Sequence, residues 1–303
     1  MRSVFSKAIL AAAQADSKVL LLTGDHGYAL FDEFRKCLPA QFINAGIAEQ
    51  NMVGVAAGLA KAGFKPIVYG LSAFVPIRVL EQIKMDVCYE NLPVVFMGDG
   101  AGLVYSSLGS SHQSTEDIAV LRCIPNISIL SPCDVYEMQY AMDQALRFES
   151  PFYVRMGKSD IGQVHQGPVS VPVGDLVPVR TGTQNNIVFL ATGSMVKTAV
   201  ALAETIDAAV WSAPGLKPIN KNQVNNIALH TKTLVTIEEH SIMGGLGSLV
   251  AEIVSETGNT RVVRMGVQDR FSQKCGSYDY LLKEHGIDVA ALLPQLSSIL
   301  ATD

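Results

Sequence analysis

Short apolar runs and longer stretches of helical periodicity alternate along the first half of the chain. The strand-like runs lie at 18–23, 41–44, 66–70, 93–97, 127–130 and 151–156. Between them, apolar residues recur with a helical period over about 3–15, 47–62, 76–90, 115–122 and 134–147. Strands that alternate with helices are typical of a parallel sheet covered by helices. We therefore expect residues 1–157 to form one α/β domain.

A second alternation of the same kind follows a segment rich in glycine and proline. This segment, 158–185, has the composition of an extended linker. Beyond it, strand-like runs lie at 186–193, 233–240 and 260–267. The predicted fold class is therefore α/β, with two domains that each hold a mainly parallel sheet flanked by helices. The second and smaller domain is expected to span 186–303.

Composition limits the classes of function that this chain can serve. Hydrophobic residues make up 49% of the 303 residues, charged residues 17%, and the net charge is −5. This balance provides enough apolar side chains for two cores and no basic surface for nucleic acids or anionic lipids. Apolar runs are only strand-length and the first residues are polar, so we expect a cytoplasmic protein. The five cysteines show neither close pairs nor metal-binding spacing, which is typical of free thiols in a reducing compartment.

The segment NAGIAEQNMVGVAAGL at 44–59 holds one carboxylate, Glu49, at the start of an apolar and glycine-rich helical pattern. No residue within one helical turn can neutralise this carboxylate. If Glu49 is buried, desolvation will raise its pKa and make it a proton donor or shuttle. The alternative is a solvent-facing residue of the first turn, where the helix dipole favours negative charge.

Several segments resemble those of one family, in the same order along the chain. They are GIAEQNMVGVAAGLA (46–60), SAFVPIRVLEQI (72–83), SSHQSTEDIAVLRCIPNISIL (110–130), FYVRMGK (152–158), VTIEEHSIMGGLGS (235–248) and MGVQDRFSQKCGSYDYLLKEHGI (265–287). Together they resemble the transketolase family, including deoxyxylulose-phosphate synthase, over nearly the whole chain. The resemblance implies a pyrimidine-binding domain for thiamine diphosphate followed by a transketolase C-terminal domain.

The resemblance implies a proton-transfer role for Glu49 and an apolar slot beside it. Thiamine diphosphate becomes reactive when its aminopyrimidine takes the imino form, and this needs an acid at N1′, which Glu49 would supply. Phe74 matches the family residue that stacks on the pyrimidine, and Leu71 and Ile77 lie three residues to either side of it. Ordinary core packing at a helix start is the alternative for Phe74.

The resemblance also implies contacts with the substrate and with the thiazolium ring. His112, in a loop after a strand, matches a family histidine that faces the sugar, and we assign it to hydrogen bonding and proton transfer. His26 is a second substrate-binding candidate. Arg155 matches an arginine that binds a substrate phosphate or carboxylate, and Asp25 an aspartate near the thiazolium. The alternatives are a surface histidine for His112, an ion pair of Arg155 with Asp160 or a neighbour, and a turn cap for Asp25.

Three sites depart from the usual pattern of split transketolases. Gly100 replaces a histidine and Leu108 an aspartate, both understood to contact hydroxyls of the donor sugar. The serine-bearing phosphate loop after Asp25 is replaced by HGYALF at 26–31. These departures predict a different donor pocket and put a phosphorylated ketose in question, while Arg155 would still bind a phosphate.

Three short motifs suggest metal, diphosphate or nucleotide binding, and we assign none of them such a site. GDG at 98–100 imitates the start of the family's Mg²⁺ and diphosphate motif, but no asparagine pair follows about 25 to 30 residues later. The run EEH at 238–240 would point adjacent side chains to opposite faces of a strand. The turn GGLG at 244–247 has the wrong spacing for a dinucleotide fingerprint and suits either subunit packing or a tight strand-to-helix turn.

A chain with this half of a transketolase needs a partner that carries the other half. That N-terminal subunit, with the motif GDG…NN, would hold most of the contacts to Mg²⁺ and the diphosphate. Because the cofactor lies between subunits in this family, the resemblance implies an α₂β₂ assembly with a β–β dimer. The implied activity is transfer of a two-carbon ketol unit between sugars or sugar phosphates. Two alternatives stay open: the β subunit of a 2-oxoacid dehydrogenase, and a non-catalytic scaffold or regulatory subunit.

Overall fold

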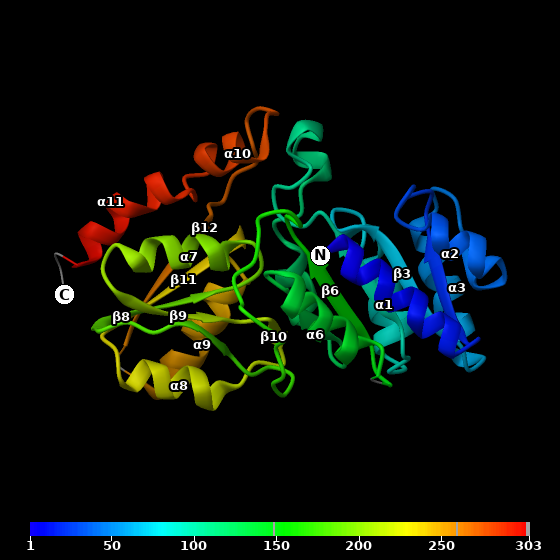
Figure 1. Ribbon diagram of the computed structural model, residues 1–303, viewed down its shortest axis with the longest axis horizontal. Coiled ribbons are helices and arrows are strands. Elements are labelled where there is room, and N and C mark those ends of the chain that lie inside the picture. Colours follow the sequence, from blue (N-terminus) through cyan, green and yellow to red (C-terminus); the bar gives the residue numbers. More distant parts are fainter. Residues whose placement is uncertain (148, 259, 301–303) are drawn as a thin grey trace.

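Two sheets with helices on both faces form two domains that lie side by side (Figure 1). The computed structural model describes residues 1–147, 149–258 and 260–300. The predicted fold class, α/β with two domains, is confirmed.

The first sheet has seven strands in the order β10-β5-β6-β4-β3-β1-β2. They are β1 (Val19–Thr23), β2 (Phe42–Asn44), β3 (Lys65–Leu71), β4 (Val95–Asp99), β5 (Ser128–Leu130), β6 (Phe152–Met156) and β10 (Gly215–Lys217). β10 runs antiparallel to β5, and the other neighbours are parallel. The parallel strands therefore end at one common edge, where the loops that follow them meet.

Helices cover both faces of the first sheet because each buries one apolar stripe. α1 (Arg2–Ala15) and α6 (Val135–Ala145) pack on one face. α3 (Glu49–Lys61), η3 (Ile83–Cys88) and α5 (Asp117–Arg122) pack on the other. Shorter helical segments are α2 (Asp32–Cys37), η1 (Pro39–Gln41), η2 (Ile77–Val79), α4 (Leu80–Gln82), η4 (Ser106–Leu108) and η5 (Ser110–His112).

The second sheet has five strands in the order β12-β11-β8-β9-β7. They are β7 (Val177–Arg180), β8 (Gln184–Ala191), β9 (Ala208–Ser212), β11 (Thr233–Ser241) and β12 (Arg261–Val267), with β7 antiparallel to β9. One face packs against α7 (Met195–Glu204), α10 (Tyr278–Glu284) and α11 (Val289–Leu300). The other packs against α8 (Lys221–Leu229) and α9 (Leu246–Thr257), whose apolar cluster continues into the α3 side of the first sheet. A shared core thus joins the two domains.

Three strands lie where the sequence pattern did not place them, namely β7, β9 and β10. β9 lies in the predicted second domain, between the strand-like runs at 186–193 and 233–240. β7 lies inside 158–185, the predicted linker, and forms an edge of the second sheet. β10 comes from the predicted second domain and extends the first sheet. β7 and β10 have only 4 and 3 residues, too few for a period of two to be recognised, so pairing with distant strands decides them.

The predicted helix at 76–90 is also different in the structure. It consists of the 3₁₀ turn η2, the short helix α4 and the π-helix η3. Pro76 at its start has no N–H to donate, and π turns are rare features that often mark functional sites. This altered winding sets the direction of the side chains between Phe74 and Leu80.

Two further expectations concern membranes and cysteines. Among the described residues, the structure has no helix of the length and apolar character that crossing a membrane requires. All five cysteines are free, as predicted: Cys88 and Cys133 are buried, and Cys37, Cys123 and Cys275 are exposed.

Candidate functional site

The carboxyl edge of the first sheet gathers most of the residues predicted for the site. Asp25 and His26 follow β1, and Glu49 follows β2 as the first residue of α3. Phe74 follows β3, and His112 ends η5 in the loop after β4. These loops are far apart in the sequence and meet because parallel strands end on the same side of the sheet.

Glu49 is buried, with 4% of its surface exposed. Arg78 of η2 is its partner, and Nη1 of Arg78 donates to the two carboxylate oxygens at 3.2 and 3.1 Å. The sequence left burial and solvent exposure of Glu49 open, and the structure shows that it is buried. Its charged partner lies beyond the neighbouring helical turn, as the segment itself indicated, because Arg78 is 29 residues away along the chain.

Phe74 lies at the centre of a group of aromatic and cationic side chains. Its ring centroid is 5.3 Å from that of His112, in an edge-on arrangement, and 6.4 Å from that of His26. The guanidinium carbon of Arg78 is 4.0 Å from the Phe74 centroid. Phe74 itself is only half-buried. A half-buried ring that meets three polar side chains is more than a core residue, so core packing alone does not describe Phe74.

The loop after β1 is fixed against the start of α3 by Asn44. Its Oδ1 accepts hydrogen bonds from the backbone N–H groups of Asp25, at 3.1 Å, and Gly46, at 3.0 Å. Asp25 has a φ of 62°, and its carboxylate accepts a hydrogen bond from the Tyr28 hydroxyl at 2.6 Å. The hydrogen bonds from Tyr28 and then Asn44 lower the pKa of Asp25. Asp25 therefore stabilises this turn, as its alternative interpretation stated, and stays exposed at the same edge.

A cavity of about 160 Å³ lies at this edge beside His26. Its polar wall is centred on Asp99, which is only 2% exposed. The Asp99 carboxylate accepts hydrogen bonds from the hydroxyls of Tyr69, at 2.7 Å, and Tyr105, at 3.2 Å. Nη2 of Arg2 donates to it at 2.7 Å. The charges of Asp99 and Arg2 thus balance, and the wall contains two tyrosine hydroxyl groups.

Leu71 and Ile77, predicted to flank Phe74, lie at different depths. Leu71 ends β3, is buried and lines the cavity beside His26. Ile77 is half-buried at the start of η2. The carboxylate of the GDG motif at 98–100 is already neutralised and hydrogen-bonded by groups of this chain, so its chemistry does not call for a metal ion.

The substrate-binding role predicted for Arg155 is wrong. Arg155 is 2% exposed, and its Nε donates to Oδ2 of Asp117 at 2.8 Å. Its Nη2 donates to the backbone oxygens of Ser114 at 3.2 Å and Glu239 at 2.9 Å. A guanidinium enclosed in this way cannot reach a ligand. The alternative of a structural ion pair is correct, with Asp117 rather than Asp160 as the partner.

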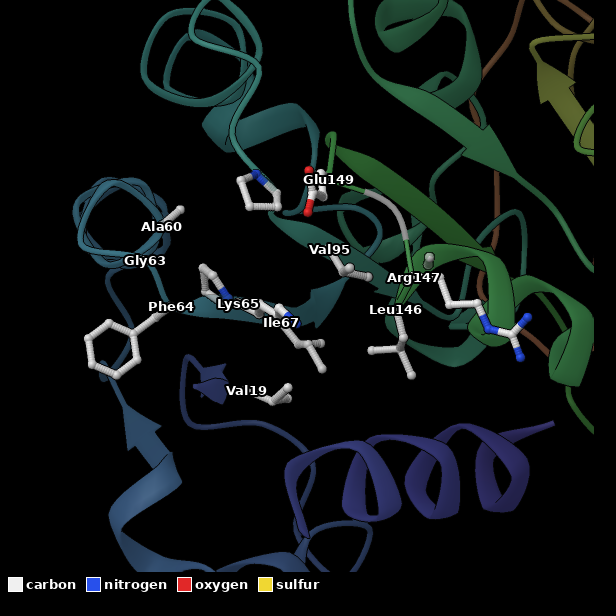
Figure 2. Close-up of a pocket in the computed structure, with 13 residues that line it drawn as sticks. Val19, Ala60, Gly63, Phe64, Lys65, Ile67, Val95, Leu146, Arg147 and Glu149 are labelled. Atoms are coloured by element: carbon white, nitrogen blue, oxygen red, sulfur yellow. The ribbon is translucent and has the colours of Figure 1, made fainter. Parts of the chain in front are cut away.

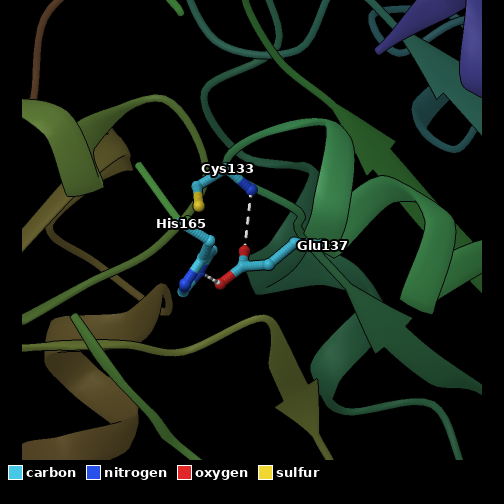
Figure 3. Close-up of side chains that lie close together, drawn as sticks. All are labelled: Cys133, Glu137 and His165. Carbon is cyan, nitrogen blue, oxygen red and sulfur yellow. Dashed lines mark hydrogen bonds and ion pairs between the residues drawn. The ribbon is translucent and has the colours of Figure 1, made fainter. Parts of the chain in front are cut away.

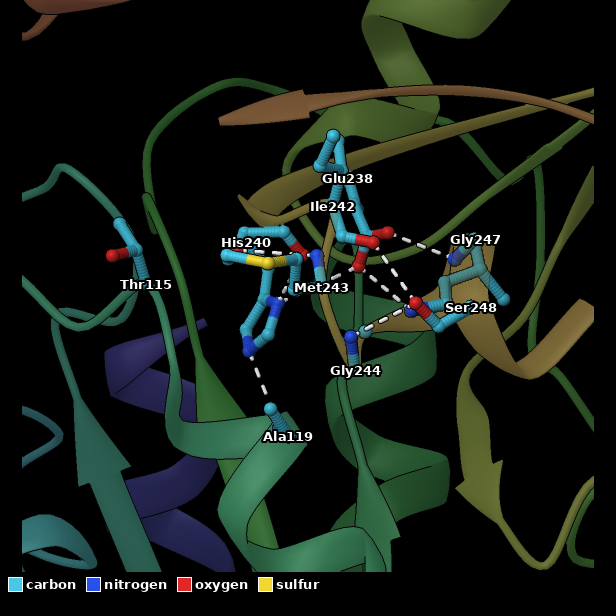
Figure 4. Close-up of polar contacts among 12 residues, drawn as sticks. Thr115, Ala119, Glu238, His240, Ile242, Met243, Gly244, Gly247 and Ser248 are labelled. Atoms are coloured by element: carbon cyan, nitrogen blue, oxygen red, sulfur yellow. Dashed lines mark hydrogen bonds and ion pairs between the residues drawn. The ribbon is translucent and has the colours of Figure 1, made fainter. Parts of the chain in front are cut away.

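The run 238–240 at the end of β11 is buried, and its side chains serve different neighbours. Glu238 accepts hydrogen bonds from the backbone N–H groups of Leu246 at 2.7 Å and Gly247 at 2.8 Å (Figure 4). A Cβ on Gly245 would lie 1.9 Å from Oε2 of Glu238. The turn at 244–247 therefore lets α9 begin directly against β11 within one chain, which agrees with the interpretation as a tight strand-to-helix turn.

His240 is enclosed next to this turn in its neutral form. Nδ1 lies 2.7 Å from the backbone oxygen of Ser241, and Nε2 lies 3.3 Å from the backbone N–H of Ala119, which donates to it (Figure 4). Oδ1 of Asp117 is 3.9 Å from Nε2 and Oε2 of Glu238 is 3.8 Å from Nδ1. Burial lowers the pKa of His240 to about 4, although the charge of Asp117 acts in the opposite direction.

The low pKa of His240 predicts a loss of stability in acid. In the unfolded chain a histidine titrates near its ordinary pKa of about 6.5, so the folded state holds fewer protons below that pH. The stabilising contribution is complete above pH 6.5 and is lost as the pH falls towards about 4, by about 3 kcal/mol in total. Urea titrations would give the unfolding free energies of the wild type and of His240→Gln at each pH. We expect the wild-type value minus the variant value to become smaller as the pH falls from 6.5 to about 4. The exposed His230→Gln is the control, and a pH-independent difference for His240→Gln would contradict the prediction.

A second cavity, of about 360 Å³, lies at the amino ends of β1, β3 and β4 (Figure 2). Apolar side chains that include Val19, Ile67, Val95 and Leu146 line it. The length of the strands separates it from Glu49 at the opposite edge. It is therefore not part of the candidate site.

Cys133, Glu137 and His165 form a buried cluster that connects α6 to the segment after β6 (Figure 3). Oε2 of Glu137 accepts from the backbone N–H of Cys133 at 2.8 Å, and Oε1 lies 2.8 Å from Nε2 of His165. Asp134 also accepts from the backbone N–H of His165, at 2.8 Å. These contacts fix the crossing segment onto the start of α6.

Sequence reasoning missed Arg78 and the groups around Asp99. Arg78 lies in SAFVPIRVLEQI, four residues after Phe74, so its presence near the site could have been read from that segment. The ion pair between Arg78 and Glu49 could not be predicted from the sequence, because α3 and η2 meet only in the folded chain. Arg2 likewise reaches Asp99 across 97 residues.

Comparison with known proteins relates both domains to one family. The model of the transketolase pyrimidine-binding domain matches residues 1–163, and that of the transketolase C-terminal domain matches residues 177–292. An apulose-4-phosphate transketolase subunit of Actinobacillus succinogenes is 35% identical over 86% of this chain and 85% of its own length. 1-Deoxy-D-xylulose-5-phosphate synthase of Cupriavidus necator is 40% identical over 86% of this chain, which spans only 41% of that protein.

A solved structure agrees with these relatives over the whole fold. It is described as a split gene transketolase, inactive beta4 tetramer, and matches with a TM-score of 0.88 at 31% identity, over 99% of this chain and 97% of that one. The two matched domains occur in the same order as the two sheets. This chain therefore belongs to the transketolase family and contains its pyrimidine-binding and C-terminal domains.

Proposed function

We propose that this chain is the β subunit of a thiamine diphosphate-dependent transketolase that transfers a two-carbon ketol unit between sugars. The observation that carries the proposal is that the buried carboxylate of Glu49 and the half-buried ring of Phe74 contact the same guanidinium, that of Arg78, at the carboxyl edge of a parallel sheet. This pair supplies an acid and a stacking surface in one place. Relatives named as transketolase subunits support the same conclusion.

The residues present fit an aminopyrimidine. The Arg78 guanidinium, a planar group that carries N–H donors, already contacts both Phe74 and Glu49. Glu49 would hold the proton at the pyrimidine N1′ and return it during turnover. Phe74 would fix the ring plane, and Asp25 would lie near the thiazolium. When bound, the cofactor supplies a nucleophilic carbon and an electron sink for cleavage of a carbon–carbon bond.

An N-terminal partner subunit would complete the site. In the described residues, the acidic group of the GDG motif, Asp99, is bonded to Arg2, Tyr69 and Tyr105. The Mg²⁺ ion and the diphosphate would therefore be held mainly by the partner, in an α₂β₂ assembly with a β–β dimer. A solved relative composed of beta chains is described as inactive, which supports a need for the partner.

The sugar would lie beside His112 and His26, which approach Phe74 from the loops after β4 and β1. The cavity centred on Asp99 would bind hydroxyl groups of that sugar, because its wall has no net charge and carries two tyrosine hydroxyls. Burial, and then the charge of Asp99, raise the pKa of Tyr105 to about 12, so this hydroxyl stays protonated. Arg155 has no place in this pocket.

Tyr105→Phe should raise KM for the sugar by about 3- to 10-fold with kcat nearly unchanged. It removes one hydroxyl whose hydrogen bond is worth about 1 kcal/mol and leaves the ring in place. Steady-state rates of ketol transfer against sugar concentration test this. Tyr89→Phe changes a tyrosine that is 78% exposed and serves as the control. An unchanged KM in Tyr105→Phe would contradict the hydroxyl-binding pocket.

The function itself is tested on the complex purified gently from its native source. Mass spectrometry would identify the proteins bound to this chain, and the complex would be assayed for thiamine diphosphate and for ketol transfer between unphosphorylated and phosphorylated sugars. We expect a stoichiometric partner with GDG…NN and cofactor only in the complex. Oxidative decarboxylation of a 2-oxoacid instead would identify a dehydrogenase β subunit, and no turnover with cofactor bound would identify a scaffold.

A further inference from the structure

Arg78 makes two contacts at the centre of the candidate site that no other described residue makes together. Its Nη1 donates to both oxygens of Glu49, and its guanidinium lies 4.0 Å from the centroid of Phe74. The Arg78 side chain is 46% exposed, whereas that of Glu49 is 4% exposed. This partly exposed cation thus contacts both an aromatic ring and a buried acid.

The two contacts are those that an aminopyrimidine would need. A pyrimidine bound in this site would stack on Phe74 and share a proton with Glu49 at N1′. A guanidinium is flat, conjugated and rich in N–H donors, so it can substitute for such a ring on both counts. Both groups cannot occupy the space between Phe74 and Glu49 at once.

We propose that Arg78 occupies the pyrimidine slot of the cofactor-free subunit and must leave it when thiamine diphosphate binds. This inference rests on the proposed function. Arg78 is then a positioning residue: it pairs with the buried charge of Glu49 until the cofactor binds, and it competes with the cofactor for both contacts. The side chain can move without unfolding the site, because almost half of it is already in water.

A hydrogen bond to the Arg78 backbone indicates that the side chain can move while the backbone stays in place. Nε2 of Gln50, the second residue of α3, donates to the backbone oxygen of Arg78 at 3.4 Å. This bond holds η2 against the start of α3 whichever way the guanidinium points. Only the Arg78 side chain therefore has to move when the cofactor binds.

The competition predicts the sign of a binding change. Arg78→Gln should lower the Kd for thiamine diphosphate about tenfold, since a partly exposed ion pair and a cation–π contact no longer have to be broken. Arg78→Lys keeps the charge but lacks the flat fork, so it should give an intermediate Kd. If Arg78 instead bound the cofactor directly, its substitution would raise the Kd.

The experiment uses the native complex and calorimetric titration with thiamine diphosphate at a fixed Mg²⁺ concentration. Arg35→Gln is the matched control, because Arg35 also lies over aromatic rings, 5.9 Å from Tyr28 and 5.8 Å from Phe42, and pairs with Asp32. Tighter binding by Arg78→Gln with no change for Arg35→Gln supports the proposal. Equal or weaker binding by Arg78→Gln overturns it.

A second measurement compares stability with and without the cofactor. Without cofactor, Arg78→Gln should have a lower urea midpoint than the wild type, because Glu49 stays buried without its cation. With saturating cofactor, the midpoints of the variant and the wild type should become equal. A midpoint that is equal to the wild type in both conditions would overturn the proposal. If neither the wild type nor any variant binds thiamine diphosphate, the proposed function fails, and the inference fails with it.

Discussion

Glu49→Gln is expected to lower the rate of ketol transfer by about 10²–10⁴-fold, the usual contribution of a positioned acid–base group. The amide has the shape of the acid but cannot exchange a proton with N1′. Its oxygen can still accept a hydrogen bond from Arg78, so the start of α3 should keep its structure. The change is measured as kcat of the complex at saturating sugar and cofactor.

The controls for this variant separate chemistry from folding and binding. Glu81→Gln changes an exposed glutamate in the nearby α4 and should leave kcat within about twofold of the wild type. Circular dichroism should show the same helix content in all three proteins. Full activity in Glu49→Gln would remove Glu49 from the mechanism, whatever the other results.

Asp117→Leu is expected to lower the unfolding free energy by about 3–5 kcal/mol, the typical effect of removing one partner of a buried ion pair. The carboxylate of Asp117 is fully buried and accepts hydrogen bonds from Arg155 Nε at 2.8 Å and the Tyr153 hydroxyl at 2.7 Å. Without it, a guanidinium and a hydroxyl would stay buried with fewer partners. Urea unfolding followed by far-ultraviolet circular dichroism measures the loss.

A second variant tests the cause of that loss. Asp117→Leu combined with Arg155→Met removes both charges and should recover part of the stability, because no uncompensated charge is left. Lys61→Met breaks an exposed pair with Glu90 and should cost less than about 1 kcal/mol. Equal effects of the buried and the exposed changes would contradict the importance of the Arg155–Asp117 pair.

This buried pair also explains why Arg155 was misassigned. The segment FYVRMGK has a strand pattern that ends near the carboxyl edge, where ligands usually bind, so an arginine there resembled a phosphate-binding residue. In the structure Arg155 points into the boundary between the domains, and its Nη2 donates to the backbone of Glu239 in β11. The element was predicted correctly, but the direction of its side chain depends on a strand 84 residues away.

Phe74 and Glu49 show the opposite case. Both were chosen by resemblance to a family, and they lie four and five residues after the predicted strands at 66–70 and 41–44. Because parallel strands end at a common edge, these two residues, His26 and His112 all lie on the same side of the sheet. Arg78 lies on the irregular helical segment 77–88, whose winding no periodicity could predict.

The sequence by itself determined the two α/β domains and most strands of the first sheet, and its resemblance to a family indicated Glu49, Phe74 and His112 as site residues. The domains and strands could be predicted because they rest on local periodicity, which repeats within a few residues. Tertiary structure alone decided the pairing of Glu49 with Arg78, the enclosure of Arg155 and the transfer of β10 to the first sheet. Each of these depends on contacts between segments distant in the sequence, and only the packing of the whole chain selects such contacts.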